Sequence, residues 1–520
     1  MIGTLATYGQ APVTLQTRDT VLDYTRPRIA LAADGSFAVA MEAFVETDFG
    51  FQRWEIAVQR YAPSGAPVGP AHFFDGESCG SLDIWTSDFM EHAELAFRPD
   101  GILLVLMQHT GQYSIVVTDV SSAEATLAAI DQAGQVIDLN SAGNCLQKKL
   151  IFPGGSRQDR PRMALAPNAF VLVTVDGFFN DSDLRNVGLR ILDGDLEQQV
   201  DLLIPHDDPA STQAFHMVPD VATNGSAILS VWQECPIIDN QGNADACDVG
   251  AQFAFVGAGG ALQVTSPNVR VNAGDPAGTI SFNPSADMNA AGNSVVVWTD
   301  TRTGSQGDIF AQRFDAAGQP VGGNLQVSAG EGVIQRRAEV AMLNDGRFMV
   351  AWTDSSAAGF RARGRRFLAD GSPEGPAFSL LNSPGYESGL PALASNGSAY
   401  VYTWLAEKGG SSAVYTSNVG VVVATEPEPA APPAATMLLE GYPNPFAEQA
   451  TLTYRLPVTG AVLMNVYDVL GREVARLVDR VQEAGTHTTR LDGGGLPPGL
   501  YVVRLQQGAV RQAHLLSRLY

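Results

Sequence analysis

Few residues in this chain have the types and spacing that nucleophilic catalysis requires. The segment GESCG at residues 76–80 matches GxSxG, the turn that presents a nucleophilic serine in α/β-hydrolases, which would make Ser78 the nucleophile. That turn needs a strand before it and a helix after it, whereas SLDIW follows here and no α/β pattern surrounds it. We therefore interpret residues 76–80 as a Gly/Ser loop that contains a cysteine.

Two aspartates could in principle form the carboxylate pair of a glycosidase. Asp300 and Asp354 follow Trp298 and Trp352 at the same offset, and paired carboxylates cleave glycosidic bonds. Because they recur at equivalent positions of a repeat, we expect them to lie apart, each bracing its own hairpin. The tryptophans are expected to fill the core rather than to form a platform for sugars.

Metal ligation has equally weak support in the sequence. HDD at 206–208 is one cluster without distant partners, and DNQGNAD at 239–245 lacks the terminal glutamate of a calcium-binding EF-hand loop. Phosphate-binding loops and dinucleotide fingerprints are absent. We predict no catalytic residue, no metal and no cofactor.

The composition restricts the partners of the protein. The formal net charge is −23 and the sequence pI is about 4.6, which disfavours nucleic-acid binding and docking on anionic lipid. No apolar run reaches the ~18 residues of a transmembrane span. The first residues, MIGTLATYGQ, lack the regions of a secretion signal, which conflicts with export unless a signal precedes them.

Four cysteines suggest an oxidising compartment. Cys235 and Cys247 enclose a short polar loop, while Cys79 and Cys145 bracket one repeat. Both pairs are disulfide candidates, although four cysteines allow three connectivities and the sequence does not choose among them.

Internal repetition is the main organising feature. Seven copies share a Pro or Ala that begins a short strand, an Asp/Asn-Gly turn, and an apolar run that ends at tryptophan. The turn position is occupied by Gly35, Gly101, Asn168, Gly225, Gly292, Gly346 and Gly397. The tryptophan position is occupied by Met41, Met107, Thr174, Trp232, Trp298, Trp352 and Trp404.

Each copy is predicted to form four short strands. The second strand, such as SVVVW, is apolar on consecutive residues, which indicates burial on both faces. Repeats of this kind favour propeller blades over a solenoid. The seventh copy lacks its fourth strand, and GQAPVTLQT at residues 9–17 could supply it. We therefore predict an all-β fold with a seven-bladed β-propeller over residues 1–424, closed by an N-terminal strand.

One repeat carries a family resemblance. WTDTRTGSQGDIFAQRF in the fifth copy resembles bacterial propeller repeats of the TolB-like and related kinds, with a Trp-x-Asp-x-Arg turn followed by Asp-Ile-aromatic. The resemblance is weaker in the other copies.

A proline-rich linker at residues 425–435 precedes a different pattern. In residues 436–520, ATLTYRLP and AVLMNVYDVLG alternate apolar and polar positions, as half-buried strands do. We predict a small immunoglobulin-like β-sandwich.

The order YPNPF, TLTYRLP, VLMNVYDVLGREVARLV, AGTHTTRLD, LPPGLYVVRLQ resembles the type A C-terminal sorting domain of the type IX secretion system. A rival is the immunoglobulin-like domain of flagellar hook-capping proteins. The resemblance implies a translocon partner and a protein secreted from, or attached to the surface of, a Gram-negative bacterium. The matching positions are Pro443, Asn444, Pro445, Phe446, Tyr467, Asp468, Gly471, Arg472, Gly499, Tyr501 and Arg504.

These observations support three hypotheses for function. The leading one is an exported binding protein whose propeller presents a platform to a glycan or protein ligand. The first alternative is an extracellular polysaccharide- or peptide-degrading hydrolase, which requires carboxylates from different blades to converge; the sequence reveals no such set. The second alternative is a structural protein of the cell envelope, which predicts a large apolar patch.

Overall fold

The structure is a computed structural model of the 520-residue chain. It describes residues 11–12, 21–46, 52–74, 88–115, 118–137, 139, 148–150, 158–166, 171–178, 185–193, 196, 198–204, 214–236, 247–256, 262–264, 268–276, 278–303, 307–328, 334–356, 359–380, 387–408, 411–419, 438–442, 446, 448–456, 459–468, 472–497, 499–507 and 510–518. The regular elements in these ranges are all β-strands, and none of them includes a helix that could cross a membrane. The chain divides into two compact units, Met1–Val423 and Ala424–Tyr520.

In the first unit, seven antiparallel sheets follow one another along the described chain. Sheet 1 contains β2 (Val21–Leu31), β3 (Phe37–Glu46), β4 (Gln52–Tyr61) and β5 (Pro67–Phe74). Sheet 2 contains β6 (Asp88–Phe97), β7 (Leu103–Ile115), β8 (Thr118–Ile130) and β10 (Lys148–Leu150), with β9 (Val136–Ile137) also paired to β8. Sheet 3 contains β11 (Gln158–Leu165), β12 (Val171–Phe178), β13 (Arg185–Leu192) and β14 (Gln198–Ile204).

The remaining sheets of this unit repeat the pattern. Sheet 4 contains β15 (Ala214–Thr223), β16 (Ala227–Pro236), β17 (Asp248–Val256) and β18 (Leu262–Val264), with β19 (Val269–Arg270) also paired to β17. Sheet 5 contains β20 (Ser281–Met288), β21 (Ser294–Asp300), β22 (Asp308–Phe314) and β23 (Pro320–Gln326). Sheet 6 contains β24 (Ile334–Met342), β25 (Phe348–Ser356), β26 (Gly359–Phe367) and β27 (Phe378–Ser379).

Sheet 7 combines the two ends of the unit. It contains β28 (Glu387–Ser395), β29 (Tyr400–Lys408), β30 (Ser411–Val419) and β1 (Ala11–Pro12). Ala11 pairs with Thr416 and Pro12 with Tyr415. Of the strand predicted at residues 9–17, the structure describes Ala11 and Pro12, and its other residues lie outside the described ranges.

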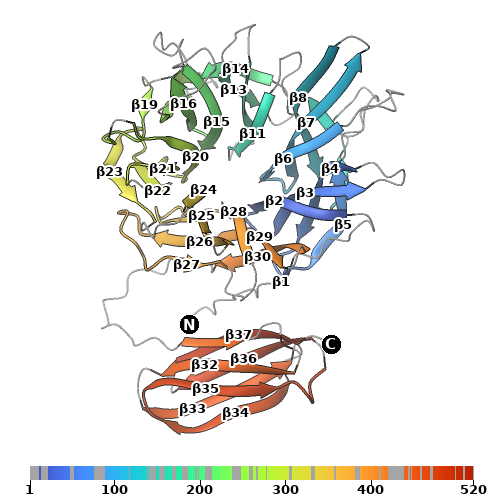
Figure 1. Cartoon of the computed structure of the whole chain (residues 1–520), viewed down its shortest axis with the longest axis vertical. Coiled ribbons are helices and arrows are strands. Elements are labelled where there is room, and N and C mark those ends of the chain that lie inside the picture. The colour runs from blue at the N-terminus through green and yellow to red at the C-terminus, as the bar shows by residue number, and fades with distance from the viewer. Residues whose placement is uncertain are drawn as a thin grey trace. The chain divides into compact units, whose positions relative to one another are not determined.

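The first strand of each sheet lies nearest the centre of the unit, in a propeller-like arrangement (Figure 1). These inner strands are β2, β6, β11, β15, β20, β24 and β28, and each contacts the next. Strand β28 also contacts β2, so the contacts form a closed cycle. A hydrogen bond from Asn396 Nδ2 to the Ala32 carbonyl, at 3.1 Å, joins the turns of sheets 7 and 1.

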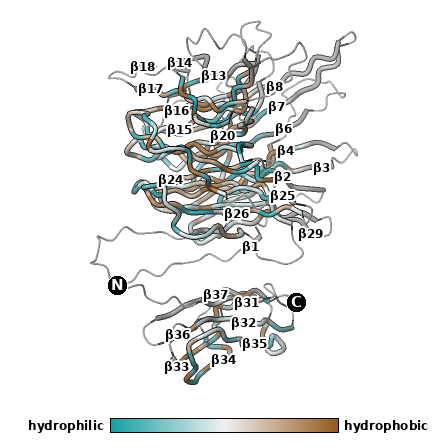
Figure 2. The backbone as a smooth tube through the Cα atoms, turned by 60° about the vertical axis from the view of Figure 1, so that its left-hand side comes forward, coloured by the Kyte–Doolittle hydropathy of each residue, from teal (hydrophilic) through white to brown (hydrophobic). Residues whose placement is uncertain are grey.

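Each sheet is buried on both faces, as the consecutive apolar residues of its second strand require. Seven hydrophobic clusters each join two neighbouring sheets. In β3, for example, Val39 and Met41 pack toward sheet 7, whereas Ala38 and Ala40 pack toward sheet 2. In Figure 2 the hydrophobic colour is accordingly concentrated on the strands of this unit.

The turn glycines of the repeat share one backbone conformation, and its tryptophans share the same degree of burial. All six turn glycines have φ between 81° and 89°, a conformation that glycine adopts without a Cβ clash: Gly35, Gly101, Gly225, Gly292, Gly346 and Gly397. Trp232, Trp298, Trp352 and Trp404 are at most 1% exposed. Residue 250 pairs with Trp232, and it is a glycine because a Cβ there would lie 2.5 Å from the indole ring.

The second unit consists of two antiparallel sheets around one core. One sheet has the order β31 (Leu438–Tyr442), β32 (Gln449–Leu456), β35 (Gly485–Asp492). The other has the order β34 (Glu473–Gln482), β33 (Gly460–Asp468), β36 (Gly499–Gln507), β37 (Val510–Arg518). Alternate residues of β32 and β33, such as Leu452, Tyr454, Val462 and Met464, fill this core, as their apolar–polar alternation predicts.

Candidate functional site at the axis of the first unit

The inner strands share an irregularity that shapes the centre of the unit. In every one of them the pairing register shifts at the same place, and a non-glycine residue there has a positive φ of 44° to 55°. These bulge residues are Arg26, His92, Arg160, Val218, Asn283, Arg337 and Leu390. Such a conformation is costly for side-chain-bearing residues, so the surrounding structure must hold it in place.

A side chain of the preceding sheet satisfies several of these bulges. The His92 amide donates to Glu42 at 3.0 Å, and the Arg160 amide donates to Gln108 at 2.8 Å. The Leu390 amide donates likewise to Thr353 at 3.0 Å. Each acceptor directly follows the tryptophan position of its repeat. The buried core of one sheet therefore fixes the central backbone of the next.

The residues two positions beyond the bulge form an ion-pair network across the axis. Arg28 Nε lies 2.9 Å from Glu94 Oε1, and Arg162 Nη1 lies 2.6 Å from the same oxygen. Glu339 Oε1 lies 3.7 Å from Arg28 and 3.8 Å from Arg162. Because these four residues come from sheets 1, 2, 3 and 6, the network links distant parts of the ring. We call Arg28, Glu94, Arg162, Asp220 and Glu339 the axial network.

Protonation within this network departs from ordinary values. Burial, reinforced by Glu339 and Glu94, raises the pKa of Asp220 to about 6, although Arg162 and the Ala286 amide oppose this. Burial acts to lower the pKa of Arg162, but the Glu94 and Glu339 carboxylates raise it above its usual value. The network therefore contains one arginine, Arg162, whose charged form is favoured by its carboxylate neighbours, and one carboxyl group, Asp220, that titrates near pH 6.

The bulge layer itself is rich in arginine. Arg26 pairs with the buried Glu42 at 3.0 Å and keeps 39% of its side chain exposed. Burial and the charges of Arg26 and Arg28 lower the pKa of Arg337. Burial and four arginines, Arg26 among them, lower the pKa of His92 to about 3, so its imidazole is neutral at pH 7. We call Arg26, His92, Arg160 and Arg337 the cationic rim.

The predicted Trp–Asp pairs lie within single sheets. Asp300 Oδ2 accepts from Trp298 Nε1 at 2.8 Å, Arg302 at 2.7 Å and Ser281 at 3.0 Å. Asp354 accepts from Trp352 Nε1 at 2.7 Å. Asp300 is fully buried, so it is placed to brace its own sheet and not to reach a ligand.

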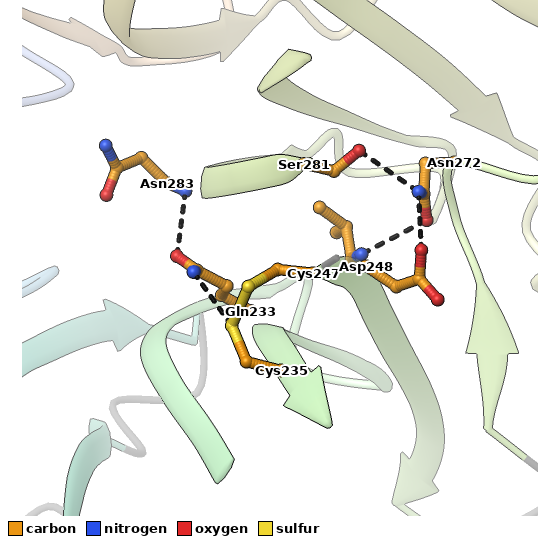
Figure 3. The surroundings of a disulfide bond; sticks show 8 residues. Gln233, Cys235, Cys247, Asp248, Asn272, Ser281 and Asn283 are labelled. Atoms are coloured by element: carbon orange, nitrogen blue, oxygen red, sulfur yellow. Dashed lines mark hydrogen bonds between the residues drawn. A yellow bond between two sulfur atoms is a disulfide. The ribbon is translucent and has the colours of Figure 1, made fainter. Parts of the chain in front are cut away.

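A disulfide joins Cys235 and Cys247 at the end of sheet 4, with a Cα–Cα distance of 4.3 Å. Figure 3 shows it beside Gln233, whose Oε1 accepts from the bulge amide of Asn283 at 3.5 Å. On the other side, Asn272 Nδ2 donates to Asp248 at 3.0 Å and to Ser281 at 3.0 Å. The bridge therefore ties β16 to β17 where sheet 4 supports the axial bulge of sheet 5.

A separate cavity of about 270 Å³ lies between sheets 5 and 6, away from the axial residues. Asn289, Asn293, Arg313, Asn344 and Asp345 contribute to its lining. It contains the Asp-Gly turn of sheet 6 and none of the axial charges.

Several predicted positions of the sorting motif occur in the second unit. Phe446 and Tyr501 are buried in its core, and the Tyr501 hydroxyl donates to the Pro497 carbonyl at 2.5 Å. The Arg504 guanidinium lies 5.0 Å from the Tyr467 ring centroid. Arg472 is exposed, and Gly499 begins β36 while Asp468 ends β33.

Other predicted positions lie outside the described residues. They are Ser78, Cys79, Cys145, Asn168, residues 206–208 and 239–245, the linker 425–435, Pro443, Asn444, Pro445 and Gly471.

Glu94, Asp220 and Glu339 meet at the axis from sheets 2, 4 and 6, a convergent set that the sequence analysis did not find. The signal was present in the repeat. Directly after its initial Pro or Ala, successive copies carry Arg28, Glu94, Arg162, Asp220, Ser285, Glu339 and Ala392. Charges of alternating sign at one position of the repeat predict ion pairs only when the copies are arranged around a common axis.

Residues 440–515 match the family model described as secretion system C-terminal sorting domain. Such a domain marks proteins that leave the cell through the type IX secretion system, for the extracellular space or the cell surface of Bacteroidetes. The predicted sorting domain and localisation are therefore confirmed: the chain is exported. No curated protein matches the chain.

The fold is similar to several solved structures at low identity. One is an ulvan lyase of polysaccharide lyase family PL25 (13% identity, TM-score 0.49, 79% of this chain and 96% of that chain). Another is an α-L-arabinanase of Penicillium chrysogenum (10%, 0.39, 80% and 98%). A third is a sialidase of Trypanosoma rangeli (9%, 0.38, 95% and 84%). Likeness at this level carries no argument about activity.

Proposed function

We propose that this exported protein recognises a glycan at the axis of a seven-bladed β-propeller and that its C-terminal domain delivers it to the cell surface or the medium. The observation that carries the proposal is the convergence of charged side chains from different sheets on one axis, where a ligand would meet them together. A rigid ring of sheets suits such a role because it holds side chains from distant segments in fixed positions.

The propeller assignment rests on the seven sheets, the closed cycle of inner strands and the pairing of β1 with β30. We assign residues 1–424 to the propeller, with repeats of the TolB-like kind, 425–435 to the linker and 436–520 to an immunoglobulin-like sorting domain of type A. Pairing of the two ends of the first unit in one sheet protects an edge that would otherwise be open.

The type IX translocon is the proposed partner of the second unit. Deleting residues 436–520 should leave the protein inside the cell, because the deletion removes the address and spares the first unit. Cell fractionation of a type IX-competent host would measure this. Export of the truncated chain would show that the address lies elsewhere.

A hydrolase is the second candidate, and the convergent carboxylates favour it. Asp220, with a pKa near 6, has the protonation behaviour of a general acid, and Glu94 and Glu339 lie in the same network. Against this, each glutamate is already ion-paired with two arginines, and the neutral His92 has too low a pKa to be an effective base near pH 7. We therefore place binding before cleavage.

The envelope alternative has less support. Among the described residues the exposed large apolar side chains are Val321, Phe360, Leu368, Val474 and Val481. Five side chains divided between two units do not provide the large patch that this alternative requires.

A thermal-shift screen of the full chain against polysaccharides tests the proposal, with new reducing ends or unsaturated products measured in the same samples. A ligand that binds only the folded state raises the melting temperature. We expect at least one glycan to raise it without being cleaved. Cleavage that is lost in Asp220→Asn would establish the hydrolase instead, and the absence of any shift or product would overturn glycan recognition.

A further inference from the structure

We infer that the axial site is specific for an acidic sugar, one that carries a carboxylate or a sulfate, and that the cationic rim binds this anionic group. The inference rests on the proposed glycan function and names the chemical class of the ligand.

The arginines of the rim share one position of the repeat. Arg26, Arg160 and Arg337 come from sheets 1, 3 and 6 and occupy the same bulge position of the repeat. The chain as a whole has a formal charge of −23, which keeps free anions away from most of its surface. Arginines gathered at the centre of such a protein therefore act against its overall field, and provide one local place where an anion is attracted.

The positive charges of the rim lie close enough to change one another's pKa values. The pKa of Arg337 is lowered by burial and then by Arg26 and Arg28, which belong to another sheet. The pKa of His92 is lowered by burial and then by Arg26, Arg28, Arg160 and Arg162. Like charges held together by the fold repel one another, and an anion bound among them would relieve that repulsion.

The cationic rim is distinct from the axial network, whose residues lie two positions further along the inner strands. Two residues along a strand correspond to about 6–7 Å. In the lower layer Arg28 and Arg162 already share Glu94 and Glu339, and these four side chains are only 17–22% exposed. The charges of these four side chains balance one another, so this layer is not the anion site.

The cationic rim, by contrast, contains three arginines and no carboxylate of its own. Among its arginines, Arg26 pairs with the Glu42 carboxylate. Neighbouring protein atoms lower the pKa of Arg337, yet the residue keeps an exposed surface, and within the described ranges its side chain forms no hydrogen bond or ion pair. Its guanidinium is therefore available to a carboxylate or sulfate, both of which match the planar fork of arginine.

The neutral members of the bulge layer favour a sugar over an acidic peptide. Asn283 carries an amide, and the uncharged imidazole of His92 can donate through one nitrogen and accept through the other. Sugar hydroxyls need both kinds of partner, whereas a stretch of acidic side chains needs donors only. A bulge layer that combines arginines with amide and imidazole groups thus fits an acidic sugar.

The test uses the full chain and pairs of polymers that differ only in charge. Dextran sulfate is compared with dextran, and polygalacturonate with its methyl ester, by titration calorimetry at low and physiological salt. The sulfate and carboxylate arms identify the anion. Poly-glutamate tests the acidic-peptide reading.

Arg337→Glu is the decisive variant, and Arg361→Glu is its control. Arg361 is an exposed arginine of the same sheet, on β26, away from the inner strand. We expect Arg337→Glu to weaken binding of a charged polymer about tenfold or more and Arg361→Glu to leave it unchanged. Arg337→Gln, which keeps the positive-φ position occupied by a polar side chain, provides a milder variant should the reversal impair folding.

Each other result has a defined meaning. Equal binding of charged and neutral polymers, unaffected by Arg337→Glu, overturns the inference but leaves the proposed function standing. Equal weakening by both reversals means diffuse attraction and overturns it as well. Binding of poly-glutamate but of no polysaccharide, or of no polymer at all, overturns both the inference and the proposed function.

Discussion

Asp300 and Glu94 are both carboxylates paired with arginine, but their partners come from different parts of the chain. Asp300 bonds to Trp298 and Arg302, each two residues away, within one sheet. Glu94 bonds to Arg28 and Arg162, 66 and 68 residues away, in the two neighbouring sheets. The first pair stabilises a single sheet, and the second joins sheets around the axis. Mutations at the two sites should therefore change the stability of the protein in different ways.

The largest expected effect comes from the local brace. Asp300→Ala should lower the free energy of unfolding by about 3–5 kcal/mol, because it leaves the Arg302 guanidinium and the Trp298 N–H without their buried acceptor. Equilibrium denaturation of the full chain, followed by tryptophan fluorescence, would measure it. A loss below about 1 kcal/mol would mean that water replaces the carboxylate and that the brace is not needed.

The axial network should show coupling between sheets. In a double-mutant cycle with Glu94→Gln and Arg162→Met, we expect each single change to cost about 2–4 kcal/mol and their coupling to be about 1–3 kcal/mol. The exposed pair of Arg476 and Asp479 in the second unit is the control, and should show no measurable coupling. Strictly additive effects of Glu94 and Arg162 would mean that the axis does not link the sheets.

This contrast also explains what the sequence revealed. The turn glycines and the tryptophan column stand out because each is dictated by its own backbone or its own buried face, so six of the seven copies keep glycine at the turn and four keep tryptophan. At the axial position of the repeat the side-chain charge changes sign from Arg28 to Glu94 to Arg162. These residues can be recognised as ion-pair partners only when the ring brings neighbouring copies together. The bulges were equally hidden, since residues as different as Arg26 and Leu390 share one backbone conformation. The sorting domain was recognisable because its motif is continuous in the chain.

A pH dependence should distinguish the inter-sheet contacts further. Asp287 accepts from the Met288 amide at 2.8 Å and from the Met342 amide of sheet 6 at 2.7 Å. Burial raises the pKa of this carboxyl group to about 7. Since the folded state then binds the proton more tightly than the unfolded state, stability should be greatest below about pH 4 for this group and decline as pH rises toward 7.

The measurement is the free energy of unfolding at several pH values for the wild type and for Asp287→Asn. The amide side chain cannot ionise, so the difference between the two proteins isolates this one group. We expect the wild type to lose on the order of 1–2 kcal/mol more than the variant between pH 5 and pH 8. Parallel profiles would show that Asp287 titrates as an ordinary exposed carboxyl group.

The smallest expected effect is at a local pair on the surface. Asp345 lies in the turn of sheet 6, where its Oδ2 is 2.7 Å from Arg347, with 39% of its side chain exposed. This pair has the same two-residue spacing as Asp300 and Arg302, but water reaches it. Asp345→Ala should therefore cost only about 0.5 kcal/mol in the same denaturation assay. If it cost as much as Asp300→Ala, sequence spacing rather than burial would determine the strength of these pairs, and the contrast between surface, sheet and axis would fail.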